Sequence, residues 1–345
     1  QMQTYLYDET TPYQRVEPAE DVVVVKPATA EEISKIMKLA NRDLTPVYPR
    51  GAGTGLVCGA VPTQDGIVIS MERFDKVEEI DKDNLMVVAG AGVTLAQLLE
   101  AVEEADLLFP PHPGDEGAQV GGMIAANAGG SRAVKYGVVR QYVKGLEVVL
   151  PNGEIAHMGG KLLKNNTGLG LMHLMIDSEG ILGIITKATM RLYPKFSGTA
   201  TLVVSFENRH DAIATVPKIL QSGVIPMAIE YVDHNVIELS AENLGMKWPA
   251  QTGIAHLILI LAGANEDDVY FQAETMSEVC QANGAVDVLI AERREEQAEI
   301  LKIRSEVYSA MKPRIAGDSD ITVPPASLGQ MLDALDEIAK KYDTT

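Results

Sequence analysis

The 345-residue chain has few cysteines and no long apolar run. Its two cysteines, Cys58 and Cys280, are too few and too far apart in the sequence for a disulfide framework, an iron–sulfur cluster or a structural zinc site. This scarcity favours a reducing, cytoplasmic location. No apolar stretch approaches the roughly 18 residues of a membrane-spanning helix. The first residues also lack the basic and then apolar pattern of a signal peptide, so we expect neither export nor a membrane span.

Basic residues are scarce relative to acidic ones. Lysine and arginine together number 29 against 48 aspartates and glutamates, which gives a formal net charge of −19. The field around such a molecule repels phosphate backbones and anionic lipid surfaces. The composition therefore argues against nucleic acid and against membrane surfaces as partners. A chain of this length predicts about two domains, at roughly 150 residues per domain.

Glycine is unevenly distributed, and the pattern of elements changes with it. Of the 30 glycines, 23 lie at or before Gly198. The earlier part alternates strands and helices irregularly, with capping-box patterns at Thr29 and Thr94. Beyond Phe196 two strand–helix–strand units follow in regular order, with strands predicted over residues 201–206, 227–232, 256–261 and 286–290 and helices over residues 211–220 and 266–283. These units predict an α+β chain whose second domain is a helix-backed sheet of the split βαβ, ferredoxin-like type.

A glycine-rich loop gives the strongest local signal. The segment Pro49-Arg50-Gly51-Ala52-Gly53-Thr54-Gly55-Leu56 directly follows the strand-like residues 45–48. Three alternate glycines let consecutive N–H groups turn toward an anion. Leu56 stands where a GxGxxG fingerprint needs glycine, and no GxxxxGK occurs. On its own, the segment is compatible with a phosphate loop or with an ordinary turn at a strand end.

Two further segments share this small-residue character. Residues 110–115 read PPHPGD and lead into residues 119–130, QVGGMIAANAGG, followed by Lys135-Tyr136-Gly137. Small residues over this length cannot build a core by themselves, which predicts that a large flat group occupies the space they leave. The segment DSEGILGIIT at residues 177–186 places Glu179 beside a glycine before a strand. Taken alone, that carboxylate reads as a solvated turn residue.

In this order, the motifs resemble the FAD-binding domain of the FAD-linked oxidases that share the vanillyl-alcohol oxidase (PCMH-type) fold. The resemblance is nearest to the branch that contains D-lactate dehydrogenase and the FAD-linked chain of glycolate oxidase. It runs from about Asp21 to Tyr193 and resumes at Ile303-Arg304 and at residues 320–324. It implies a two-part FAD-binding domain over residues 1–196 and a substrate domain over residues 197–345, which we expect to be incomplete at its C-terminal end.

The resemblance also implies which residues hold FAD. The backbone from Arg50 to Gly55 would bind the pyrophosphate, Pro111 and Gly114 would approach the flavin, and residues 119–130 would line the cofactor. In full, the implied FAD-binding residues are Arg50, Gly51, Ala52, Gly53, Thr54, Gly55, Leu56, Pro111, Gly114, Gln119, Val120, Gly121, Gly122, Ala125, Asn127, Ala128, Gly129, Tyr136, Gly137, Val138, Glu179, Gly180 and Ile185.

Two positions depart from the family pattern. Members that attach FAD covalently carry histidine in the glycine loop, where this chain has Thr54, so we expect non-covalent FAD. Relatives usually have aspartate where this chain has His112. That histidine is open to a structural role or to a role in tuning the flavin.

Oxidation of a 2-hydroxy acid requires a cation for the carboxylate, a base for the hydroxyl proton and a hydride acceptor. Arg304 matches the family's arginine, and a guanidinium suits a carboxylate, but a surface ion pair with nearby acids such as Glu306 is an equal alternative. Arg314 is a second, weaker candidate. The family's metal-binding histidines have no counterpart before Thr345: the six histidines contain no close-spaced pair, and His256 reads as a core residue. We therefore expect a divalent metal, if there is one, to be held by sequence beyond this segment.

The resemblance thus implies an FAD-dependent dehydrogenase of a small D-2-hydroxy acid, with D-lactate or glycolate as the leading substrates. Without cysteine clusters of its own, the chain would pass electrons to an electron-transferring flavoprotein or to an iron–sulfur subunit. Two alternatives keep the fold: an NADPH-dependent reductase, and an electron-relay subunit with no substrate of its own. The sequence does not specify the hydroxy acid, the acceptor, the reactivity toward oxygen or the oligomeric state.

Overall fold

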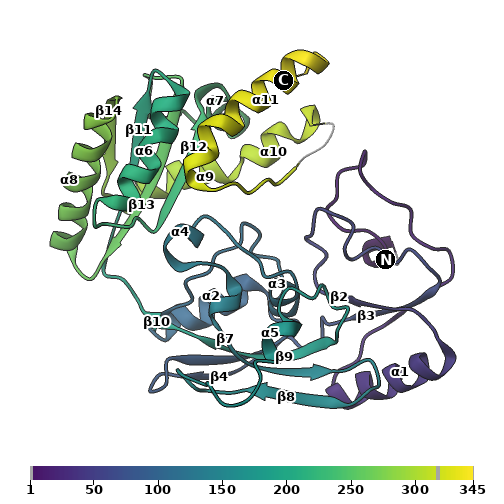
Figure 1. Cartoon of the computed structure of the whole chain (residues 1–345). Helices are drawn as coiled ribbons and strands as arrows, with labels where there is room; N and C mark the ends of the chain where they lie inside the picture. The colour runs from purple at the N-terminus through teal and green to yellow at the C-terminus, as the bar shows by residue number, and fades with distance from the viewer. Residues whose placement is uncertain (1–2, 316–318, 345) are drawn as a thin grey trace. The chain divides into compact units, whose positions relative to one another are not determined.

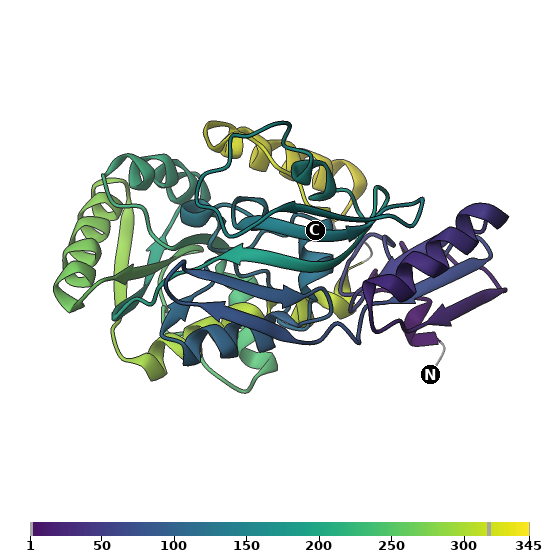
Figure 2. The ribbon, with the colours of Figure 1, turned by 90° about the horizontal axis from the view of Figure 1, so that it is seen from below.

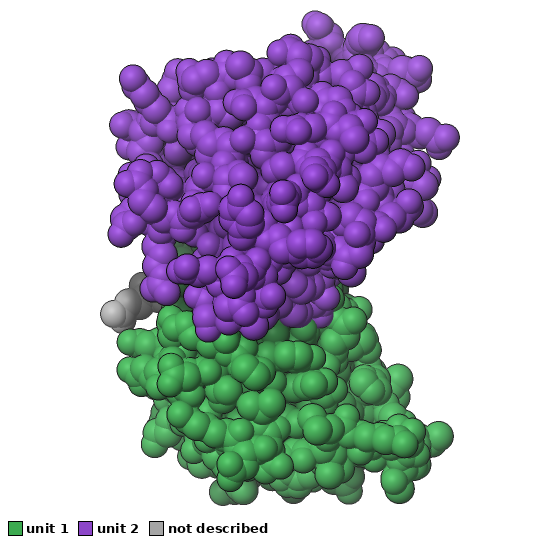
Figure 3. Space-filling model, turned by 90° about the vertical axis from the view of Figure 1, so that its left-hand side faces the viewer, with its two compact units in different colours: residues 1–130, 137–195 green, residues 131–136, 196–345 purple. Residues whose placement is uncertain are grey.

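The computed structural model describes residues 3–315 and 319–344, and the chain divides into two compact units (Figure 3). Unit 1 comprises residues 1–130 and 137–195, and unit 2 comprises residues 131–136 and 196–345. The chain therefore enters unit 2 twice, first through a six-residue segment and then through its C-terminal part. That first segment contains the tyrosine of the Lys135-Tyr136-Gly137 motif.

Unit 1 begins with a small parallel sheet in the order β1-β3-β2, and helix α1 lies between β1 and β2 in the sequence (Figure 1). The side chain of Thr29 accepts a hydrogen bond from the N–H of Glu32, as the capping pattern predicts. The Glu32 carboxylate reaches back to the N–H of Ala28, one residue before the cap. The elements of this part are β1 (Val22–Val25), α1 (Ala30–Asp43), β2 (Val47–Arg50) and β3 (Gly66–Ser70).

A second sheet of unit 1 has five antiparallel strands in the order β4-β5-β9-β7-β8. Thr94 and Gln97 form the full reciprocal capping box at the start of α2. The Asn152-Gly153 turn between two apolar stretches predicts a hairpin, which is present as β7 paired with β8. The remaining elements of unit 1 are β4 (Val77–Asp81), β5 (Met86–Gly90), α2 (Leu95–Glu104), β6 (Leu107–Leu108), α3 (Val120–Ala125), a 3-10 turn (Val139–Gln141), β7 (Val143–Val149), β8 (Ile155–Gly159), α5 (Met172–Met175), β9 (Ile184–Arg191) and β10 (Tyr193–Pro194).

Unit 2 contains a four-stranded antiparallel sheet in the order β12-β13-β11-β14. Because β11 and β12 each pair antiparallel with β13, they run parallel to each other and are split by it. The predicted split βαβ sheet is therefore confirmed. Its elements are β11 (Gly198–Phe206), α6 (Arg209–Gln221), β12 (Ala228–Asp233), α7 (His234–Asn243), β13 (Ala255–Gly263), α8 (Glu266–Ala282) and β14 (Ala285–Ala291).

Helices cover both faces of this sheet. Alternate residues of β11 and β13 pack against α6 and α8 on one face, and the intervening residues pack against α7 and α9 on the other (Figure 1). Every residue of β13 is consequently buried, which explains its continuous apolar sequence. Unit 2 also contains α4 (Ala133–Tyr136), α9 (Arg294–Ser305), α10 (Val307–Met311), α11 (Leu328–Tyr342) and two 3-10 turns (Lys312–Arg314 and Pro325–Ser327). Among the described residues, no helix has the length and apolar character needed to cross a bilayer.

Candidate functional site

The glycine loop follows the last residue of β2, Arg50, a buried residue that is 4% exposed. The guanidinium donates to the carbonyls of Thr4 and Tyr7 at 2.8 and 2.7 Å. Gly53 has φ +80°, and a Cβ there would lie 2.1 Å from Nη2 of Arg50. Only glycine fits above that guanidinium.

The peptide groups of this loop are oriented by the N-terminal segment. The single N–H of Glu9 donates to the carbonyls of Gly53 and Gly55 at 3.2 and 3.0 Å. In a trans peptide the following N–H points away from the carbonyl, so the amides of Thr54 and Leu56 face the opposite side. Within the described residues, none of the N–H groups of residues 52–56 donates a hydrogen bond. The loop thus presents free amides suited to an anion.

Two other predicted segments lie beside this loop. Gln119 is the N-cap residue of α3, and a Cβ added at Gly51 would lie 3.4 Å from its Oε1. A Cβ added at Gly180 would lie 3.1 Å from Cγ of Pro49, just before the loop. The structure therefore brings together the glycine loop, the start of α3 and the Glu179-Gly180 turn. The Glu179 side chain is exposed there, on a residue with φ +50°.

The glycines of α3 differ in what surrounds them. Gly121 packs against the end of β5: its N–H donates to the carbonyl of Ala91 at 2.8 Å, and a Cβ would lie 2.7 Å from Cβ of that alanine. Val120 is fully buried, and its N–H donates to Val93. Gly122 is exposed, with no described atom within 4 Å of an added Cβ. Open space for a ligand therefore adjoins Gly122, whereas Gly121 serves helix–sheet packing.

The proline-rich segment packs on the residues that follow α3. A Cβ at Gly130 would lie 1.9 Å from the carbonyl oxygen of His112, so these two stretches are in close contact. Nε2 of His112 lies 3.2 Å from a carboxylate oxygen of Glu116. Pro111 is buried, whereas Gly114 is exposed and has open space where a Cβ would stand.

The remaining predicted cofactor residues lie near the end of α3, in β9 or in unit 2. The side chain of Asn127, which has φ +48°, accepts from the N–H of Arg140 at 3.1 Å. Ala128 accepts from Val139, Gly129 faces Val138, and Ile185 is buried in β9. Tyr136 belongs to unit 2, where its ring stacks on Phe196 at 6.4 Å between centroids. Ala125 ends α3, and Gly137 has φ +70°.

These features fit FAD. Free amides in a glycine loop suit its pyrophosphate, and Gly114 and Gly122 leave space where other residues would place a side chain. Two buried oxygens at the loop, Oε1 of Gln119 and Oδ2 of Asp8, have no hydrogen-bond partner among the described residues. A bound ligand rich in hydroxyl and amide donors would satisfy both. No motif in the sequence pointed to Asp8 or to the Glu9 amide.

The candidate substrate arginines lie in unit 2. Arg304 is on α9, and its Nε and Nη2 contact one carboxylate oxygen of Glu230 on β12. Burial raises the pKa of the Glu230 carboxyl, and the charge of Arg304 opposes the rise. The expected alternative partner, Glu306, instead accepts from Asn243 at 2.8 Å. Arg314 is exposed in the 3-10 turn after α10.

His234 and His256 form a close pair that their separation of 22 positions in the sequence does not reveal. Nδ1 of His234 lies 2.9 Å from Nε2 of His256, and Ser205 Oγ lies 3.2 Å from the other ring nitrogen of His256. His256 is fully buried, so its predicted core position is correct, and burial lowers its pKa to about 4. Within the part of the chain that the structure describes, no cluster of three or more His, Cys, Asp or Glu residues is arranged to hold a metal.

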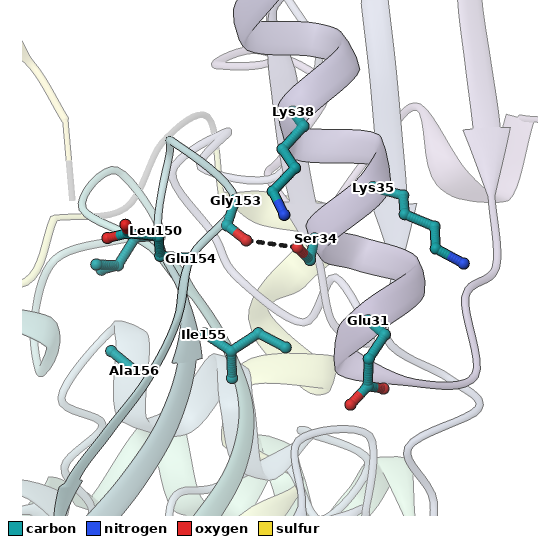
Figure 4. Close-up of a pocket in the computed structure, with 9 residues that line it drawn as sticks. All are labelled: Glu31, Ser34, Lys35, Lys38, Leu150, Gly153, Glu154, Ile155 and Ala156. Atoms are coloured by element: carbon teal, nitrogen blue, oxygen red, sulfur yellow. Dashed lines mark hydrogen bonds between the residues drawn. The ribbon is translucent and has the colours of Figure 1, made fainter.

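A pocket of about 600 Å³ lies elsewhere in unit 1, between α1 and the β7–β8 hairpin (Figure 4). Ser34 Oγ donates to the carbonyl of Gly153 at 2.5 Å across it, and Lys35 and Lys38 line its helical side. None of the predicted cofactor residues contributes to this pocket. It is therefore separate from the glycine-loop site.

Comparison with known proteins defines the class. Residues 22–159 match the FAD binding domain family, and residues 197–345 match the C-terminal domain of FAD linked oxidases. The chain belongs to the FAD-linked oxidase family and is an FAD-dependent oxidoreductase. The fold and cofactor expected from the sequence are confirmed.

Individual relatives resemble nearly the whole chain. It is 42% identical to a D-lactate dehydrogenase of Archaeoglobus fulgidus, over 98% of this chain and 74% of the relative. It is 36% identical to the glycolate oxidase subunit GlcD of Bacillus subtilis, over 98% of this chain and 72% of that protein. A solved structure of alkyldihydroxyacetonephosphate synthase superposes with a TM-score of 0.66 at 20% identity, over 81% of this chain. This chain spans little more than half of that protein, 56%, and the likeness concerns the fold alone.

Proposed function

We propose that this protein oxidises a small D-2-hydroxy acid, D-lactate or glycolate, to the corresponding 2-oxo acid. The observation that carries the proposal is the 42% identity to a D-lactate dehydrogenase over 98% of the chain. The similarity to a chain of glycolate oxidase supports the same substrate class. The proposal fits the family chemistry, because FAD when bound supplies the acceptor for the hydride on the substrate carbon.

The chain's own residues would bind and orient the reactants. The free amides of residues 52–56 would hold the cofactor's pyrophosphate, and Gln119 Oε1 would accept a donor beside it. Arg304 would orient the substrate carboxylate. Its Nε and Nη2 contact Glu230, which fixes the guanidinium plane, while Nη1 remains for the substrate on a side chain that is 39% exposed.

Electrons would then pass to a separate protein, such as an electron-transferring flavoprotein or an iron–sulfur subunit. Support comes from the cysteines of the chain. Cys280 is buried in the core between the sheet and α8, and Cys58 lies in the loop after β2. Two such thiols cannot ligate an iron–sulfur cluster.

Steady-state turnover with an artificial dye acceptor tests this proposal. D-lactate, L-lactate and glycolate are supplied separately, and pyruvate or glyoxylate is quantified as product. We expect product from D-lactate or glycolate and little from L-lactate. Dye reduction by NADPH alone would instead indicate a reductase. No reduction by any of these donors, in protein that carries FAD, would indicate an electron-relay subunit.

A further inference from the structure

The N-terminal segment contains a buried carboxylate with an unused oxygen. Asp8 is a buried residue that is 6% exposed. Its Oδ1 accepts from the N–H of Thr10 at 3.1 Å, whereas its Oδ2 has no hydrogen-bond partner among the described residues. Burying a carboxylate oxygen without a donor is costly. An arrangement of this kind is expected where a ligand supplies the missing donor.

Several contacts hold this segment against the glycine loop. The N–H of Cys58 donates to Oγ1 of Thr10 at 2.8 Å, and the Arg50 guanidinium donates to the carbonyls of Thr4 and Tyr7. In Figures 1 and 2 the N-terminal chain accordingly runs beside β2 and β3. Together with the Glu9 amide, these bonds fix the segment around Asp8 from both sides.

The unused oxygen borders the cofactor loop. A Cβ added at Gly55 would lie 4.0 Å from Oδ2 of Asp8, with no other described atom nearer. The charge of Asp8 acts on Arg50, where it opposes the lowering of the arginine pKa by burial. The Arg50 donors, however, go to backbone carbonyls, and no described cation lies within ion-pair distance of Asp8. Oδ2 is therefore a buried oxygen beside the loop that has no donor among the described residues.

We propose that Asp8 is a cofactor-binding residue whose Oδ2 accepts a hydrogen bond from a hydroxyl group of FAD. With the pyrophosphate on the amides of residues 52–56, the next donors along the cofactor are the ribityl hydroxyls on one side and the ribose hydroxyls on the other. Gln119 lies at the Gly51 end of the loop and Asp8 at the Gly55 end. The two orphan oxygens thus lie at opposite ends of the loop. The proposal depends on FAD binding and is independent of the substrate.

Asp8→Asn is the informative variant because it retains the local turn. The N–H of Thr10 would continue to bind the amide oxygen, which turns the new NH2 group toward the loop. This NH2 group is a hydrogen-bond donor, so it could not accept the hydrogen bond that the cofactor hydroxyl is proposed to donate to Asp8. A charge-assisted hydrogen bond of this type corresponds to roughly a ten- to hundredfold change in affinity. Glu20→Gln is the matched control, because it removes an exposed acid from the same segment.

The experiment measures FAD dissociation constants of the reconstituted apoproteins by flavin fluorescence, together with the melting temperatures of the apoproteins. We expect Asp8→Asn to weaken FAD binding at least tenfold while the apoprotein melts no lower than the parent and Glu20→Gln behaves as the parent. Unchanged FAD affinity would overturn the proposal. A lower apoprotein melting temperature accompanied by the loss of FAD would also overturn it, because it would assign Asp8 a purely structural role.

Competition with cofactor fragments identifies the hydroxyl. ADP carries the ribose and the pyrophosphate, whereas FMN carries the ribityl chain. If Asp8→Asn weakens the binding of ADP alone, Asp8 accepts its hydrogen bond from the ribose. If it weakens the binding of FMN alone, Asp8 accepts it from the ribityl chain. No hydroxy acid enters these assays, so their failure leaves the proposed dehydrogenase function untouched.

Discussion

Arg304 on α9 and Glu230 on β12 form an ion pair in which one carboxylate oxygen contacts two nitrogens of the guanidinium. The Glu230 side chain is 14% exposed and that of Arg304 is 39% exposed, so the cation is the partner that meets solvent. The two residues are 74 positions apart in the sequence, and the packing of α9 on the sheet brings them together. A substrate carboxylate would have to share this cation with Glu230.

The first prediction concerns this shared cation. Arg304→Ala should lower kcat/KM for D-lactate by roughly ten- to a hundredfold, and Arg304→Lys should restore only part of it, since lysine lacks the forked geometry. Glu230→Gln should lower KM severalfold, because it removes the competing carboxylate. FAD content should stay constant in all three variants. If Arg304→Ala leaves kcat/KM unchanged, the arginine is only an ion-pair residue, and Arg314 becomes the next candidate.

The second prediction concerns the glycine loop. Gly53→Val places a side chain at φ +80° and against the Arg50 guanidinium, at a strain cost of about 1–3 kcal/mol for the backbone alone. FAD occupancy after purification should fall sharply. Gly59→Ala is the control in the same stretch, because no described atom lies within 4 Å of its added Cβ. Normal flavin content in Gly53→Val would place the pyrophosphate elsewhere.

The third prediction is that FAD is held without a covalent bond. Thr54 stands where the resemblance places the histidine of covalent flavoproteins, and the loop offers the cofactor backbone amides. Acid precipitation should therefore release the yellow chromophore into the supernatant. Flavin that stays with the washed pellet would show a covalent link and contradict this expectation.

Local patterns predicted much of the fold because they act over a few residues. The Thr94–Gln97 capping box and the β7–β8 hairpin depend on neighbours in sequence, and both are present as expected. Helix α7 was not predicted, although its N-cap residue, Asp233, is of a type that favours this position. Strands β3 and β4 were not predicted either. The expected strand at residues 45–48 is shifted to Val47–Arg50.

The site was less predictable, because its key relationships join residues far apart in the chain. The three glycines were compatible with an anion loop or with an ordinary turn, and nothing local shows that Glu9 orients the peptide groups of this loop or that Asp8 borders Gly55. Likewise, the ion-pair alternative for Arg304 rested on nearby acids such as Glu306, whereas the sheet supplies Glu230. Such pairings depend on tertiary packing, which sequence spacing does not encode.

The fourth prediction is an acid sensitivity of unit 2. Burial, aided by the neighbouring His234, lowers the pKa of His256 from 6.5 to about 4. As the pH falls, His256 therefore binds a proton near pH 6.5 in the unfolded chain but only near pH 4 in the folded protein. Protonation of His256 should lower the free energy of unfolding by about 3 kcal/mol as the pH falls from 6.5 to 4. Above pH 7 this residue should make no pH-dependent contribution.

Fluorescence of the single tryptophan measures this effect, because the ring of Trp248 lies 5.8 Å from that of His256. Denaturant unfolding at a series of pH values should show a shallower acid slope in His256→Gln than in the parent. His157→Gln alters an exposed histidine, 72% exposed in its side chain, and should keep the parental slope. Equal slopes in all three proteins would mean that His256 titrates normally.

The central claim, FAD-dependent oxidation of a D-2-hydroxy acid, is tested most directly by anaerobic mixing of the FAD-loaded protein with D-lactate, glycolate or L-lactate. The visible absorption of the oxidised flavin is followed in a single turnover, without any electron acceptor. We predict rapid, saturable bleaching by D-lactate or glycolate, with equimolar 2-oxo acid formed, and little or no bleaching by L-lactate. Flavin that stays oxidised with both D-lactate and glycolate, yet is reduced by NADPH or dithionite, would contradict the account.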